Sequence, residues 1–151
     1  MEKQFEILKA SRLIILKVIE SLSLDQLNKI PTGFRNNIAW NVAHLLVTHQ
    51  LLFYKLSSLP IAVNDEMVKK YTKGTAPESD ITKQELEHIK EQFLSLVDTS
   101  KKDYDNNLFK IYHPYPTSAN VTLNTIDEAI QFNNFHEGLH LGYILALKKS
   151  V

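Results

Sequence analysis

The sequence predicts an all-α protein, a four-helix bundle with two long connections. Four stretches carry apolar residues at the three- and four-residue spacing of amphipathic helices, and no stretch alternates convincingly as a strand does. Residues suited to capping a first turn precede the second, third and fourth of these stretches. Because a chain of 151 residues is near the usual size of one domain, we expect a single domain over residues 1–151.

The first long helix is predicted over residues 5–22, where apolar residues recur at heptad-like spacing. Arg12 interrupts this apolar stripe. Residues 23–26 then have the form of a capping box, with Ser at the start and Gln three residues later. We therefore expect a short helix before Pro31.

Three further long helices follow. The second runs from about Asn36, a good N-cap, to about Ser57. The third begins at a second capping box, Thr82–Glu85, and a similar box at Thr125–Glu128 opens the fourth, which runs to about Lys149.

The connections between these helices are long. Ser58–Ile81 joins the second and third helices, and Asp65–Tyr71 within it can form a helical turn or two. Tyr104–Thr122 leads to the fourth helix and contains the aromatic segment 112–116, which we expect to pack over one end of the bundle. Loops of this length in a compact domain are usually functional or disordered, so we expect both to wall a pocket.

Composition narrows the class of function. Lys plus Arg equals Asp plus Glu at 17 each, so no basic field is available to hold nucleic acid. No apolar run approaches the roughly 20 residues of a membrane span, and the N-terminus reads directly into an amphipathic helix rather than a signal peptide. The chain has no cysteine, which excludes disulfides and thiolate ligands. The cytoplasm is the expected location.

The pattern H-E-x-x-H at residues 136–140 is the most informative motif. Side chains four residues apart share a helix face, so both imidazoles can turn onto one metal ion. A catalytic site needs a third ligand, and residues 141–151 contain no His, Asp, Glu or Cys. The extended peptidase pattern also fails, because Tyr143 and Ala146 stand where it requires Gly and His. The third ligand must therefore come from upstream.

His44 is the best upstream candidate because it lies in a strongly apolar helical stretch. It shares a face with Trp40, Asn41 and Thr48, and that face points into the bundle. A buried imidazole needs a partner, and a metal ion is one way to supply it. The plainer alternative is that His136 and His140 are core histidines, hydrogen-bonded to polar residues on the same faces (Asn41, Thr48 and Asn133).

The remaining candidates have two interpretations each. Glu137 can act as a base near the metal or lie on the surface. His49 lies about 140° around the helix from His44, which favours a surface or interface role. His88 sits among charges and is expected to be solvated, and His113 is expected in a loop, where it can touch a substrate.

Two motifs resemble a known family. They are N-x-x-W-N-x-A-H-L-L at residues 37–46 and H-x-x-x-H-L-G-x-I at residues 136–144. In this order, and in a chain of this length, they are similar to the DinB-like superfamily of four-helix-bundle, divalent-metal proteins. The resemblance implies metal ligands at His44, His136 and His140. The family often has Gln where this chain has Tyr143, which puts any substrate role of that position in doubt.

The resemblance also implies a function. Better-understood branches, the bacillithiol S-transferases and the mycothiol-dependent maleylpyruvate isomerases, activate a low-molecular-weight thiol at such a site. We expect zinc or nickel, with iron or manganese also suited to imidazole, and Asn41, Thr48 and Asn133 as residues that orient the ligands. Metal-assisted hydrolysis with Glu137 as base, and a non-catalytic bundle that binds metal or a small molecule in a stress response, are the alternatives.

Two helices have more apolar surface than one bundle interior can bury. The fourth carries a second stripe of Phe135, Leu139 and Ala146, and the second is apolar on nearly all sides. Either the long connections cover these faces or two copies of the chain pack through them. The resemblance implies a homodimer.

Overall fold

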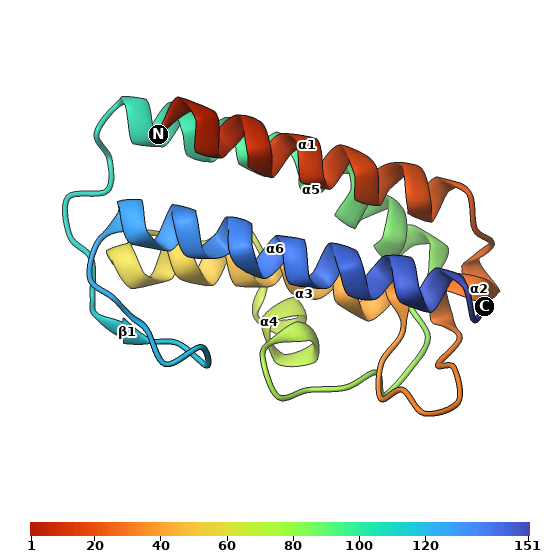
Figure 1. Cartoon of the computed structure of the whole chain (residues 1–151). Coiled ribbons are helices and arrows are strands. Elements are labelled where there is room, and N and C mark those ends of the chain that lie inside the picture. The colour runs from red at the N-terminus through yellow and green to blue at the C-terminus, as the bar shows by residue number, and fades with distance from the viewer.

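The structure is a computed structural model that describes residues 1–151, and it is an all-α bundle. Four long helices form the bundle, and three shorter helical elements and a small hairpin lie in the connections between them (Figure 1). The elements in chain order are α1 (Glu2–Glu20), α2 (Leu24–Asn28), α3 (Ile38–Phe53), η1 (Lys55–Ser57), α4 (Asp65–Tyr71), α5 (Lys83–Asp105), β1 (Tyr115–Pro116), β2 (Thr122–Leu123) and α6 (Ile126–Lys148).

Each long helix contacts two others, so the four form a ring in the order α1, α6, α3, α5. Helices α1 and α6 run in one direction, and α3 and α5 run in the other (Figure 1). An ion pair between Lys9 and Asp98 links α1 to α5. Because α3 and α5 are parallel, the chain must return along the bundle between them, and the connection that contains α4 makes this crossing.

The helix starts follow the local capping rules. Ser23 and Thr82 each form the predicted capping box, in which the N-cap side chain and the third helical side chain bond to each other's backbone. Helix α3 starts one residue later than predicted, because Asn37 rather than Asn36 accepts the backbone N–H of Trp40. At α6, Thr125 is the N-cap, but the predicted capping box does not form, because the Glu128 carboxylate accepts from the backbone N–H of Asn124 and not of Thr125.

Helix α3 is the centre of the core, with 14 of its 16 residues buried. It ends at Phe53, before the predicted end at Ser57, and a 3-10 turn follows. Helix α4, which occupies the predicted segment Asp65–Tyr71, packs against α3. The long connections therefore cover the outer side of α3, which was one of the two alternatives for burying its apolar surface. Helix α6 differs, because Phe135 and Leu139 stay exposed.

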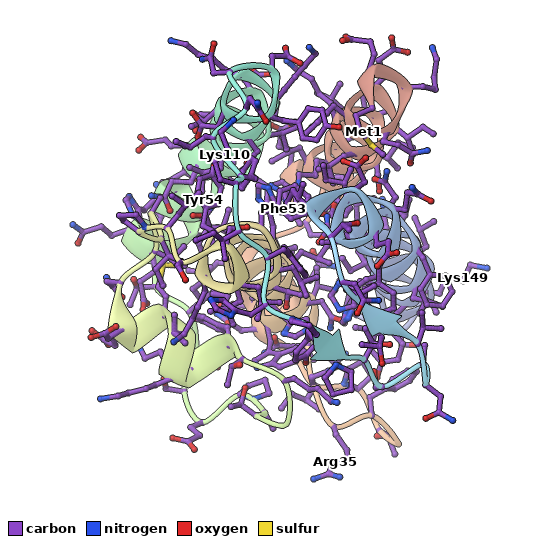
Figure 2. All side chains as sticks on the ribbon, turned by 90° about the vertical axis from the view of Figure 1, so that its left-hand side faces the viewer. Met1, Arg35, Phe53, Tyr54, Lys110 and Lys149 are labelled. Carbon is purple, nitrogen blue, oxygen red and sulfur yellow. The ribbon has the colours of Figure 1, made fainter.

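The second long connection contains two short strands that the sequence did not predict. They pair in an antiparallel hairpin, with Tyr115 opposite Leu123. The backbone N–H of His113 donates to the carbonyl of Leu56 in η1, which ties this segment to the end of the bundle where α3 stops, as expected. Figure 2 looks along the bundle from that end, with Phe53 among the helices and Arg35 projecting outward. No helix has the length and apolar character needed to cross a bilayer.

Candidate metal centre

Three histidines from two helices converge where α3 crosses α6. His44 comes from α3, and His136 and His140 come from successive turns of α6. Each offers a nitrogen within 4.8 Å of the other two. Nε2 of His44 lies 3.2 Å from Nε2 of His136. Two nitrogens bound to one tetrahedral ion at 2.0–2.1 Å lie roughly 3.3 Å apart, so this pair already has the spacing of metal ligands.

The His44 ring is held on two sides. Its Nδ1 lies 2.6 Å from the backbone carbonyl of Tyr71 at the end of α4, and Trp40 stacks on it with ring centroids 4.7 Å apart. A carbonyl oxygen only accepts hydrogen bonds, so Nδ1 carries the proton and Nε2 is left with a free lone pair. No residue pattern indicated a role for Tyr71, because the group that accepts the hydrogen bond is its backbone carbonyl. Trp40 was expected on this face.

Asn41 fixes the His140 ring in the same way. Its amide nitrogen donates to the carbonyl of Asn37 at 2.7 Å and to Oδ1 of Asn36 at 3.2 Å. This leaves Oδ1 of Asn41 to accept from Nδ1 of His140, at 2.7 Å. His140 therefore also presents a bare Nε2. Asn41 has the orienting contact expected of it, a hydrogen bond of the kind that positions metal-ligating histidines in proteins.

The other contacts of the centre are less complete. Nδ1 of His136 is buried and has no hydrogen-bond partner. The hydroxyl of Thr48 lies 3.3 Å from Nε2 of His44, which is the nitrogen that faces the centre. A residue that orients the ring would bond to Nδ1 instead. Thr48 thus touches the centre without setting which nitrogen of an imidazole is protonated.

Burial keeps these imidazoles neutral. It lowers the pKa of all three histidines below the ordinary 6.5. Burial, together with the charges of His140 and His44, lowers the pKa of His136 to about 3, and burial with the charge of His44 lowers that of His140 to about 4. Metal ions bind the neutral imidazole, so the donor set is ready for a divalent ion at neutral pH. With three neutral ligands, an ion would retain its full charge and an open position.

Glu137 does not lie on the surface. Its side chain has no exposed surface, and both carboxylate oxygens bind the guanidinium of Arg12 on α1. The surface interpretation is wrong, because the carboxylate is paired inside the bundle. Asn133 makes no hydrogen bond to an imidazole, since its amide nitrogen donates to Glu137 at 3.3 Å and its Oδ1 has no partner. Arg12 was missed, although its place within an apolar stripe was a signal of burial.

The other histidines lie away from the centre. His49 is fully buried, which overturns the expected surface or interface role, and its Nε2 lies 3.0 Å from the hydroxyl of Ser100 on α5. Burial holds the pKa of His49 well below its ordinary value, and the positive charge of Arg12 lowers it further. His88 is exposed, as expected. His113 is exposed and bonds to Ser58.

Two cavities lie beside the centre rather than over it. One of about 170 Å³ is walled by Trp40 and by Tyr71 and other residues of the first long connection. A shallower one lies between the end of α5 and the start of α6. Neither is lined by a histidine of the centre. His136 and His140 are each partly exposed, whereas His44 is buried.

Comparison with known proteins gives one family. A family model described as the DinB superfamily matches residues 7–144, a range that includes all three histidines of the centre. No curated protein matches the chain.

Proposed function

The chain is a member of the DinB superfamily, and we propose that its three-histidine centre holds a divalent metal ion that activates a low-molecular-weight thiol for transfer to a small electrophile. The observation that carries the proposal is the convergence of neutral imidazoles with the protons of His44 and His140 fixed on Nδ1. When bound, such an ion lowers the pKa of a thiol or a water molecule in its open position.

The residues of the chain divide this work. His44, His136 and His140 hold the ion, and the carbonyl of Tyr71 and the amide of Asn41 keep two of the rings turned toward it. Zinc or nickel suits this set of nitrogen ligands, and iron or manganese is compatible with it. The chain has no cysteine, so the reacting sulfur belongs to a second substrate. We place the protein in the cytoplasm, where small thiols are kept reduced.

Hydrolysis with Glu137 as the base has less support. A general base must lie within hydrogen-bond reach of the proton it removes. The carboxylate of Glu137 bonds to Arg12 and Asn133, and none of its hydrogen bonds reaches a histidine. Thiol activation needs no such base, because the ion itself favours the thiolate.

The proposal includes a homodimer. Phe135, Leu139 and Leu145 on α6 are 53%, 57% and 41% exposed, and they form one apolar face with Gly138 and Gly142. A Cβ at either glycine would meet no atom within 4 Å, so nothing inside the chain requires glycine there. Glycine within a helix costs about 1 kcal/mol relative to alanine, and the close approach of a second copy supplies a reason for it.

A conjugation assay tests the enzymatic part. Zinc-loaded protein is incubated with 1-chloro-2,4-dinitrobenzene and, one at a time, a panel of cellular thiols, and adducts are followed by absorbance and mass. We expect turnover with at least one thiol, and none for His44→Ala under the same conditions. His88→Ala is the matched control, because that histidine is exposed and outside the centre. Full metal loading without turnover on any thiol would leave a metal-binding bundle that is not a transferase.

A further inference from the structure

The rotation of α6 about its own axis is not what hydrophobic burial alone selects. Its buried residues include Asn133 and Glu137, while Phe135 and Leu139 are 53% and 57% exposed. A helix that is apolar on nearly all sides can bury several alternative faces. Some other interaction must therefore fix the face that points inward.

Arg12 on α1 makes that interaction. Its Nε and Nη2 donate to the carboxylate of Glu137 at 3.0 and 2.6 Å, and its Nη1 donates to the carbonyl of Phe93 on α5 at 2.7 Å. The guanidinium also lies 4.6 Å from the centre of the Phe93 ring. Both charged side chains have no exposed surface. Three helices are thus joined at one buried point.

This point lies in the same turn of α6 as the metal ligands. Glu137 follows His136 directly and precedes His140 by three residues. Successive residues of a helix are about 100° apart, so a rotation that brought Leu139 inward would carry both histidines away from α3. A buried ion pair often stabilises a fold no more than apolar residues of similar size would. Its best-attested use is to fix the register of packed elements.

We infer that Arg12 is a positioning residue for the metal centre: its buried pair with Glu137 sets the rotation of α6 that turns His136 and His140 toward His44. The inference rests on the proposed metal centre. It requires that the three rings already lie together in the metal-free protein, before any ion binds. The ring centroid of His44 lies 5.2 Å from that of His136 and 4.9 Å from that of His140.

The test is a double variant, Arg12→Met with Glu137→Leu, which removes both charges and leaves neither buried without a partner. The matched control is Lys9→Met with Asp98→Leu, an exposed pair that joins α1 to α5 and does not touch α6. Two quantities are measured well below the unfolding temperature of each protein. They are zinc affinity, by competition with a chelator, and the nuclear Overhauser effect between the His44 and His136 ring protons without metal.

We expect the double variant to fold, to lose the Overhauser effect and to bind zinc about tenfold more weakly or worse, the scale of other losses around metal ligands. The control should keep both properties of the wild type. Wild-type affinity and an intact Overhauser effect in the folded double variant would overturn the inference. Failure of the wild type to bind zinc would instead remove the proposed function, while the metal-free comparison still decides whether Arg12 sets the rotation.

A second variant covers the case in which the double variant does not fold. Arg12→Lys keeps the charge but cannot donate to both carboxylate oxygens and to the carbonyl of Phe93 from one planar group. We expect a folded protein with a weakened Overhauser effect and lower zinc affinity. Unchanged values for both would count against a positioning role.

Discussion

Nε2 of His44 lies 3.2 Å from Nε2 of His136, although 92 residues separate them in the chain. His136 can donate to the bare Nε2 of His44 only in the tautomer that protonates its own Nε2, and its buried Nδ1 has no partner. A cation bound between the three rings would use the bare nitrogens of His44 and His140 together with Nε2 of His136.

Asn41 and Thr48 should differ in their effect on metal affinity. Asn41→Leu removes the acceptor for Nδ1 of His140, and we expect zinc affinity to fall about 10- to 100-fold. Thr48→Val removes a contact to the nitrogen that faces the ion, so affinity should stay unchanged or rise. Chelator competition measures both variants. Equal losses in the two would show that Asn41 does not orient the ring.

The metal-free protein should lose stability in acid through its histidines. The unfolded chain protonates them near pH 6.5, whereas the folded chain does so only near a pKa of about 3 for His136 and about 4 for His140. Between these values the unfolded state binds more protons, so the free energy of unfolding falls as the pH is lowered. Calorimetry in the presence of a chelator should show a declining Tm below about pH 6.5. His136→Gln should give a shallower decline, and an identical slope would contradict the assignment.

Removal of Arg12 alone should destabilise the fold strongly. Arg12→Met leaves the carboxylate of Glu137 buried without its cation, and such a change costs about 3–5 kcal/mol. Lys9→Met breaks an exposed ion pair of α1 and should cost about 1 kcal/mol or less. Urea denaturation compares the two. The expected difference disappears if water or another group solvates Glu137 in the variant.

The apolar face of α6 should hold two copies together. Leu139→Glu places a charge in the middle of that face, and light scattering should show a change from dimer to monomer. Val121→Glu is the control, because Val121 is comparably exposed, at 54%, and lies in the hairpin segment rather than on α6. A wild type that is monomeric at all concentrations would remove the homodimer from the proposal.

Features that depend on neighbours in sequence could be predicted. The capping boxes at Ser23 and Thr82 and the helical turns of Asp65–Tyr71 follow from local hydrogen bonding. The spacing of His136 and His140 placed both rings on one face, and the apolar setting of His44 pointed it inward.

Features that depend on a partner far away in the sequence could not be predicted. The burial of Glu137 is decided by Arg12, which is 125 residues away, and periodicity on α6 gave no single inward face. His49 was expected outside because only its angle to His44 was considered, and Ser100 on another helix provides the partner that allows its burial. The hydrogen bond from His44 to Tyr71 uses a backbone carbonyl, which no residue type reveals.

Elemental analysis of protein purified without added metal tests the three-histidine centre most directly. We predict about one divalent ion per wild-type chain, none in His44→Ala, and the wild-type content in His113→Ala, since four-coordinate sites of this kind need all three protein ligands. A wild type without metal that also fails to take up zinc, or a His44→Ala variant with undiminished metal content, would contradict the account.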